Sequence, residues 1–230
     1  MIITIDGPSG TGKSTVAKKV AENLEFAFFD TGAMYRAVTW CIRQKNIKLE
    51  DEKAIEILLD QFVFHIQDNK GSKRYFVGET DVTEDIRTRE ITGIVSAVSA
   101  LPIVRQKIWG IQRQFGEKMD AVFEGRDMGS TVFPHADLKI FLNARPEVRA
   151  ERRYKEFQGK VLPNTMKEEE VLREIIARDA ADSSRALSPL KKADTAIEID
   201  TSDLTIEQVV GLILTYYVQV KQKYDVLDHH

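Results

Sequence analysis

The sequence has a single cysteine, no long apolar run and no excess of charge of one sign. Cys41 is the only cysteine among 230 residues, which excludes an internal disulfide and is typical of a reducing compartment. No apolar run reaches the roughly 18 residues that span a bilayer. The formal net charge is −3, so a basic surface for nucleic acid is not expected. We therefore expect a cytoplasmic protein without a membrane or nucleic-acid partner.

The length suits one α/β core, or a core with a small insert, but not two full domains. The chain opens directly on the β-branched run Ile2–Ile5, so a signal peptide is not expected. Cys41 lies in an apolar stretch with helical periodicity and is interpreted as a core residue rather than a catalytic thiol.

Apolar runs alternate with stretches of helical periodicity along most of the chain, which favours a parallel sheet covered by helices on both faces. The predicted strands are 2–5, 26–29, 121–123, 138–142 and 195–199. The predicted helices are 13–24, 32–45, 52–59, 90–100, 102–115, one from Pro146, one from a Thr165–Glu168 capping box to before Ser183, and one capped by Thr205 and Gln208 that runs to about Lys223.

The segment Phe62–Val82 breaks this alternation. Phe62, Phe64 and Ile66 alternate with other residues, and turn residues follow at 69–71 and at Gly78. This pattern predicts an antiparallel hairpin or three-stranded meander, inserted into the α/β core.

A glycine-rich loop follows the first predicted strand and matches the P-loop pattern G-x-x-x-x-G-K-[ST]. Such a loop turns backbone N–H groups toward phosphate, its lysine neutralises the β- and γ-phosphates, and its hydroxyl binds Mg²⁺. The helix that begins at Lys13 adds its positive end. The residues predicted to bind the triphosphate are Gly7, Pro8, Ser9, Gly10, Thr11, Gly12, Lys13, Ser14 and Thr15, with Ser14 as the metal ligand.

A P-loop alone does not distinguish a kinase from a GTPase or a motor. The sequence has no Asn-Lys-x-Asp guanine-reading motif, and no predicted strand ends in the apolar run plus aspartate expected of a typical Walker B motif. Arginines are instead scattered through the second half of the chain. A kinase for a small phosphate-bearing molecule is favoured, because such an enzyme must hold two phosphorylated ligands.

Charged residues follow two of the predicted strands at the carboxyl edge, where such sheets bind ligands. Arg36 lies just after the second strand and either holds an acceptor phosphate or sits on a helix face. Arg126 and Asp127 lie between Gly125 and Gly129 and either contact a polar ligand or form a local salt bridge in a turn.

Two further charged sets occur at helical spacing. Arg178, Asp182 and Arg185 are expected on one helix face, and so are Arg149, Arg152 and Arg153. On spacing alone, a solvated charged face is the default interpretation of both sets.

Taken together and in order, these segments resemble bacterial cytidylate kinases over nearly the whole chain. The segments that carry the resemblance are 3–13, 30–36, 86–88, 125–134 and 178–190. The resemblance implies the P-loop nucleoside monophosphate kinase fold. Its expected parts are a core (about 1–60, 88–150 and 183–230), an acceptor-binding insert (about 61–87) and a lid (about 151–168).

The resemblance also implies transfer of the γ-phosphoryl group of ATP to CMP or dCMP, giving ADP and CDP or dCDP, with Mg²⁺. Lys13, Arg126 and Arg178 would be catalytic. The cytosine would be read by Thr31, Arg105, Asp127 and Arg185, the sugar held by Ser96, Arg178 and Asp182, the acceptor phosphate by Arg36 and Arg126, and ATP by Arg152 and Arg153 of the lid. The family often has serine where this chain has Thr31. We expect a monomer.

Two alternatives stay open. One is a P-loop kinase for another acceptor, such as UMP, AMP or shikimate. The other is a regulatory protein that senses ATP without phosphotransfer, against which the arginine-rich acceptor side argues.

Overall fold

The computed structural model describes residues 1–69, 72–158 and 167–227. The chain folds into two compact units, one formed by residues 1–29 and 115–230, the other by residues 30–114. The first unit contains β1 (Ile2–Asp6), α1 (Lys13–Leu24), most of β2 (Ala27–Asp30), β6 (Ala121–Gly125), a π-helical turn η2 (Met128–Val132), β7 (Leu138–Asn143), α6 (Pro146–Gln158), α7 (Glu168–Ser183), β8 (Ile197–Asp200) and α8 (Ile206–Leu227).

The strands of the first unit form a five-stranded sheet in the order β2-β6-β1-β7-β8. The ladders of β1 with β6, β1 with β7 and β7 with β8 are all parallel, as the alternation of strands and helices predicted. Asp6, the last residue of β1, pairs in register with Gly125, the last residue of β6. The P-loop and the Arg126–Asp127 turn therefore start from neighbouring strand ends.

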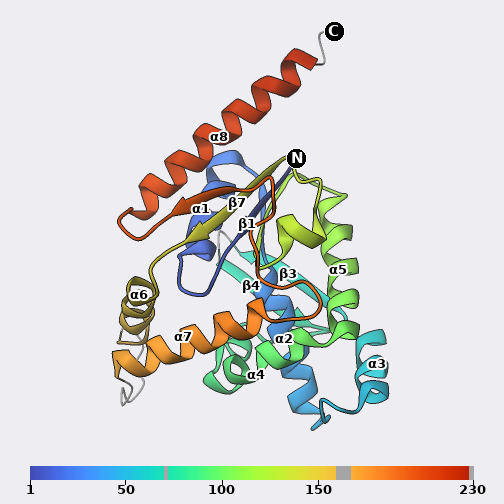
Figure 1. Cartoon of the computed structure of the whole chain (residues 1–230). Helices are drawn as coiled ribbons and strands as arrows, with labels where there is room; N and C mark the ends of the chain where they lie inside the picture. The colour runs from blue at the N-terminus through green and yellow to red at the C-terminus, as the bar shows by residue number, and fades with distance from the viewer. Residues whose placement is uncertain (70–71, 159–166, 228–230) are drawn as a thin grey trace. The chain divides into compact units, whose positions relative to one another are not determined.

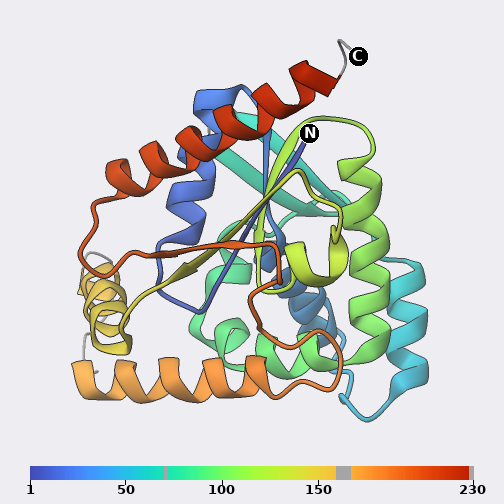
Figure 2. The same cartoon turned by 45° about the horizontal axis from the view of Figure 1, so that its top comes forward.

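One face of this sheet packs against α1 and α8, which lie side by side in Figures 1 and 2. Ile3 and Ile5 of β1 point into this core together with Val16 and Val20 of α1 and Ile213 of α8, and all five are buried. The alternation of side chains along β1 sends Thr4 to the other face. Burial of this apolar face anchors the strand that carries the P-loop.

The opposite face carries an aromatic cluster. The ring of Phe123 lies 4.8 Å from that of Phe29 and 4.4 Å from that of Phe133. Phe115 adds a further ring 4.8 Å from Phe29. These ring contacts pack β6 on this face of the sheet as well, and so they hold the strand from which the turn after Gly125 starts.

The second unit contains α2 (Thr31–Gln44), α3 (Glu52–Asp60), β3 (Phe64–Asn69), β4 (Ser72–Val77), β5 (Thr80–Asp81), η1 (Asp85–Arg87), α4 (Arg89–Ala100) and most of α5 (Pro102–Gly116). Strands β3, β4 and β5 form an antiparallel three-stranded sheet, which confirms the predicted meander. The carboxylate of Asp30 accepts the Ala33 N–H and caps the start of α2.

Most predicted elements are present within a residue or two of their expected bounds. The cap of α8 forms as predicted. Thr205 Oγ1 accepts a hydrogen bond from the Gln208 N–H, and the side-chain oxygen of Gln208 accepts one from the Thr205 N–H. Thr165, the expected cap of α7, lies outside the described residues, and so does most of the loop of the predicted lid. The short turns η1 and η2 are additional to the predicted elements.

The predicted end of α7 is confirmed to within a residue, but one interpretation from helical spacing is wrong. α7 ends at Ser183, so Arg185 lies beyond the helix, and the expectation that it shares a helical face with Arg178 and Asp182 is wrong. The carbonyl of Asp182 accepts the Leu190 N–H at 2.9 Å, whereas in a continuing helix it would accept the N–H four residues on.

Within the described part of the chain, no single helix is long and apolar enough to cross a membrane. The pair α4 and α5 passes that test jointly on length and composition, with a 94° bend between the two helices.

Candidate active site

The loop from Gly7 to Ser14 has a backbone that requires glycine. Gly10 and Gly12 have φ of 80° and 86°, in the left-handed region, and Gly7 has φ of 146°. A Cβ on Gly7 would lie 2.0 Å from the carbonyl oxygen of Leu142 on β7. The loop thus turns tightly against the neighbouring strand, and only glycine fits at its first position.

Lys13 opens α1 and is only 5% exposed. Its Nζ donates to the carbonyl of Pro8 at 2.6 Å, and Thr11 Oγ1 donates to the same oxygen at 3.2 Å. Burial, and then the positive charge of Arg126, lower the pKa of Lys13 to about 7. The ammonium therefore lies in a place where a polyanion would stabilise its charged form.

Arg126 and Arg178 both act on Lys13 by like-charge repulsion, while Glu124 and Asp179 act in the opposite sense. The three residues predicted to be catalytic are thus close enough to interact electrostatically, and all belong to the first unit. Lys13 with two further cations acting on it suits the charge of phosphoryl groups in transfer.

Ser14 follows Lys13, and its hydroxyl donates to the Glu124 carboxylate at 2.7 Å. Among the described residues, no cluster of three His, Cys, Asp or Glu side chains could hold a metal. A hydroxyl beside one carboxylate is nevertheless the donor set that Mg²⁺ uses when substrate phosphates supply further oxygens. The two residues present therefore fit Mg²⁺, with Glu124 as a partner that the sequence prediction lacked.

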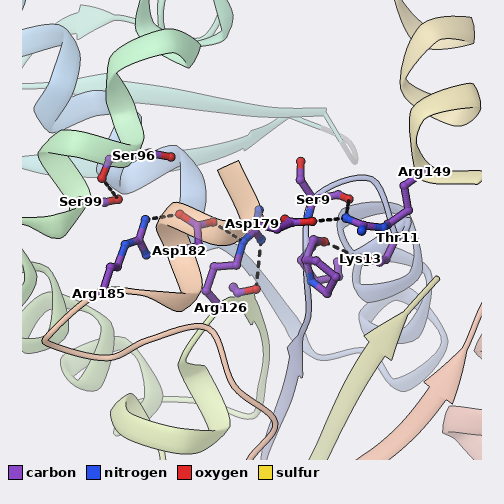
Figure 3. A network of polar contacts seen from close by, with 12 residues as sticks. Ser9, Thr11, Lys13, Ser96, Ser99, Arg126, Arg149, Asp179, Asp182 and Arg185 are labelled. Atoms are coloured by element: carbon purple, nitrogen blue, oxygen red, sulfur yellow. Dashed lines mark hydrogen bonds and ion pairs between the residues drawn. The ribbon is translucent and has the colours of Figure 1, made fainter. Parts of the chain in front are cut away.

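Asp182 joins two predicted acceptor residues, as Figure 3 shows. Its carboxylate accepts Arg126 Nε at 3.1 Å and also pairs with Arg185. The side chains of Asp182 and Arg185 are only 2% and 6% exposed. The default of a solvated charged face is therefore wrong for these two, because each buried charge is compensated by the other.

Asp6 holds the turn on which Asp127 sits. Its two carboxylate oxygens accept the N–H groups of Met128 at 2.9 Å and Gly129 at 2.7 Å. Burial raises the pKa of Asp6 to about 7, although the two N–H donors stabilise the carboxylate and act to lower the pKa. Asp6 therefore connects the end of β1, where the P-loop starts, to the turn that carries Asp127.

The three arginines of α6 have different environments. Arg149 is buried and reaches the P-loop, where Nη1 donates to the Ser9 carbonyl at 3.0 Å. Arg152 donates to the hydroxyl of Thr201 at 3.0 Å and to its carbonyl at 2.6 Å. Arg153 pairs with Glu156 near the surface. The default of a solvated face fails for Arg149, and the ATP contacts expected of Arg152 and Arg153 stay predictions.

The remaining predicted residues belong to the second unit. Thr31 is buried at the start of α2. Arg36, further along the same helix, donates to Thr92 Oγ1 at 2.7 Å and to the Ile86 carbonyl at 3.3 Å. Arg105 is 1% exposed and donates to the Ser99 carbonyl at 2.8 Å. Ser96 lies on α4, three residues before Ser99.

Arg105 also lies over two aromatic rings, 5.4 Å from the centre of Tyr35 and 5.7 Å from that of Trp109. Such packing holds the guanidinium in one position. Arg36 and Arg105 therefore share their unit with Thr31 and Ser96, whereas Asp127 and Arg185 belong to the first unit.

Four residues of the site were missed from the sequence. Glu124 could have been recognised as the acid at the end of an apolar strand. It was missed because the typical acidic residue at the end of such a strand in P-loop proteins is aspartate. Asp6 stands at a strand end before Gly7, which was a weak signal. Asp179 and Thr201 had none, because their partners Ser9 and Arg152 are remote in sequence.

A family model described as Cytidylate kinase matches residues 3–219. The chain is 52% identical over 226 residues to a protein named cytidylate kinase from Protochlamydia amoebophila, with 97% of this chain and 99% of that protein covered. It is 48% identical to another from Lactobacillus johnsonii, covering 97% and 96%. Among solved structures, a shikimate kinase from Bacteroides thetaiotaomicron is similar in fold, with a TM-score of 0.50, 14% identity and coverage of 94% and 98%.

Proposed function

The chain belongs to the cytidylate kinase family, and we propose that it transfers the γ-phosphoryl group of ATP to CMP or dCMP, releasing ADP and CDP or dCDP. One observation of the fold supports this most. The P-loop and the Arg126–Asp127 turn leave neighbouring ends of β1 and β6, so a triphosphate site and charged acceptor residues share one sheet edge.

The reaction needs little covalent chemistry from the protein. A phosphate oxygen of the acceptor is already anionic and attacks the γ-phosphorus, while the bond to the β-phosphate oxygen breaks and its electrons remain on ADP. Lys13, Arg126 and Arg178 would neutralise the charge on the transferred group. The lowering of the Lys13 pKa by Arg126 and Arg178 supports this assignment.

Mg²⁺, when bound, would neutralise and orient the β- and γ-phosphates. We propose that Ser14 holds it, with Glu124 beside it, since the hydroxyl and carboxylate are in contact at 2.7 Å. Arg152 and Arg153 of α6 would contact ATP.

We propose the following roles for single residues in recognising the acceptor. The Asp127 carboxylate would accept a hydrogen bond from the amino group of cytosine, which uracil lacks, and Thr31, Arg105 and Arg185 would bond its carbonyl oxygen O2 and ring nitrogen N3. Ser96 and Asp182 would bind the sugar, and Arg36 the phosphate with Arg126 and Arg178. Residues 61–87 would form the acceptor-binding insert, and about 151–168 the lid.

We further propose a cytoplasmic monomer without nucleic-acid or membrane partners. The net charge of −3 and the single cysteine support this.

An acceptor panel tests the function. ADP release is measured with ATP and CMP, dCMP, UMP, AMP, dTMP or shikimate, each as the sole acceptor. We expect CMP and dCMP to give the highest kcat/KM. A higher kcat/KM with another acceptor would contradict the assignment of CMP and dCMP as substrates. ATP binding without ADP release on any acceptor would favour a regulatory protein that senses ATP.

The variant Asp127→Ala tests base recognition. Because a buried hydrogen bond to the amino group would be lost, we expect kcat/KM for CMP to fall by about 100-fold or more, while the KM for ATP changes little. Equal losses for both substrates would contradict the assignment of Asp127 to the base.

A further inference from the structure

The tip of the phosphate-binding loop is held by side chains of two helices. The carboxylate of Asp179 on α7 accepts the Ser9 N–H at 3.1 Å, and Arg149 on α6 donates to the Ser9 carbonyl at 3.0 Å. Both backbone polar groups of Ser9 are therefore bonded by side chains, and Figure 3 shows the two side chains meeting at this residue. Arg149 and Asp179 also form an ion pair with each other.

This arrangement is rigid. Arg149 is 5% exposed, and its Nε is fixed by the Ala144 carbonyl at 2.9 Å. A Cβ on Gly10 would lie 3.0 Å from the Cβ of Arg149, so the loop passes close over this side chain. A buried ion pair with additional hydrogen bonds holds one geometry, because separating it would leave a charge without compensation.

The helix that holds Ser9 also carries residues proposed for the acceptor. Arg178 precedes Asp179 directly, and Asp182, less than one turn further on, holds Arg126 and Arg185. A displacement of α7 along or about its axis would move Ser9 and these residues together. The donor loop and the acceptor residues of the first unit therefore have a common support.

We propose that Asp179, together with Arg149, is a positioning pair that couples the phosphate-binding loop to the acceptor residues of α7, so that each nucleotide tightens the binding of the other. This inference rests on the proposed function for the identity of the two nucleotides. Neither residue contacts the reacting atoms in this role. They act through Ser9 and through the placement of α7.

A pair that only stabilises the fold would behave differently from a coupling pair. Loss of a purely structural pair lowers the melting temperature but leaves the folded fraction with normal ligand synergy. Loss of a coupling pair changes the factor by which one ligand alters the affinity for the other, which is a free-energy coupling between two sites.

The test is calorimetric titration of the full chain with CMP, alone and in the presence of the non-hydrolysable analogue AMP-PNP with Mg²⁺, and the reverse titration. We expect the two nucleotides to strengthen each other by about fivefold or more in the unchanged chain. In Asp179→Ala the factor should fall toward one, with a lower kcat, while the affinity for AMP-PNP alone falls less. Asp179→Asn retains an acceptor for the Ser9 N–H and should recover part of the coupling.

Because Asp179→Ala leaves Arg149 a buried cation without its carboxylate, the double variant Arg149→Met/Asp179→Leu is titrated as well. It removes both charges and should lose the coupling while remaining folded. Glu169→Gln, an exposed carboxylate on the same helix, is the matched control and should retain the full factor.

Coupling that stays within about twofold of the unchanged chain in all folded variants would overturn the proposal. The outcome is separable from the function. If the acceptor panel identifies another acceptor, that compound replaces CMP in the titrations and the prediction is the same. If no acceptor shows synergy with AMP-PNP in the unchanged chain, the coupling pair is rejected, whatever the enzyme phosphorylates.

Discussion

At the scale of single residues, burial drives Lys13 and Asp6 toward their neutral forms. The pKa of Lys13 is lowered to about 7 and that of Asp6 is raised to about 7, and both are 5% exposed. A buried ammonium beside Arg126 is unfavourable until an anion arrives. The triphosphate supplies that anion, so nucleotide binding and protonation of Lys13 are expected to be linked.

We predict that binding of Mg²⁺ and ATP takes up a proton at pH 8. With a pKa of about 7, about nine-tenths of Lys13 would be neutral there before binding, and the phosphates raise its pKa so that it binds a proton. The measurement is titration calorimetry in two buffers of different ionisation enthalpy, in which proton uptake makes the observed heats differ.

Lys13→Arg is the control, because a guanidinium stays charged in both states. It should bind with little dependence on the buffer. Equal heats in the two buffers for the unchanged chain would show that Lys13 is already charged before binding.

At the scale of elements, the joint between β1 and α1 depends on tight backbone packing. A side chain on Gly7 would collide with the carbonyl of Leu142 at 2.0 Å, and backbone cannot move aside as a flexible side chain can. At Gly211, inside α8, an added methyl group would meet no atom within 4 Å beyond its own helix and immediate neighbours. The same substitution should therefore have opposite effects at the two positions.

We predict that Gly7→Ala lowers the free energy of unfolding by about 2–4 kcal/mol through strain and displacement of β7. Gly211→Ala should raise it by about 0.5–1 kcal/mol, because alanine has the higher helix propensity. Urea unfolding followed by circular dichroism measures both. A Gly7→Ala chain as stable as the parent would mean that the loop can adopt another path.

Element boundaries also mark the limit of prediction from spacing. The cap at Thr205 formed as expected because its partner Gln208 is three residues away. The end of α7 also lies within a residue of its predicted place, but the expected place of Arg185 on a helical face was wrong, because no helical periodicity reveals the bond between the Asp182 carbonyl and the Leu190 N–H. Arg185 nevertheless meets Asp182, through the turn after the helix rather than along it.

At the scale of the whole molecule, the proposed site residues are divided between two units. Lys13 and Arg126 belong to the first unit, and Arg36, on α2, belongs to the second. α2 also carries Cys41, which is 8% exposed and the only cysteine of the chain. Burial raises the pKa of its thiol to about 11, so little reactive thiolate forms near neutral pH.

We predict that Cys41 resists alkylation in the native chain and reacts only when the second unit opens. At pH 8, iodoacetamide labelling followed by mass spectrometry should be slow, and saturating CMP should slow it further. A ligand at about 100 times its Kd lowers the population of open chain about 100-fold. The chain in guanidinium chloride, which should react at once, is the control, and rapid labelling without denaturant would contradict the prediction.

The sequence by itself determined what depends on neighbouring residues. The loop Gly7–Ser14 is contiguous, so its glycines, its lysine and the following helix could be identified in order. The meander at 62–82 could be predicted from alternating apolar residues and from turn residues. Family resemblance, carried by several such short segments, added predictions for the acceptor side.

Only the tertiary structure decided which distant residues meet at the loop. Glu124 bonds Ser14 from 110 positions away, and Asp179 bonds Ser9 from 170 positions away. Parallel strands are joined by long connections, so residues at adjacent strand ends come from remote parts of the chain, and no local pattern records which of them will be paired.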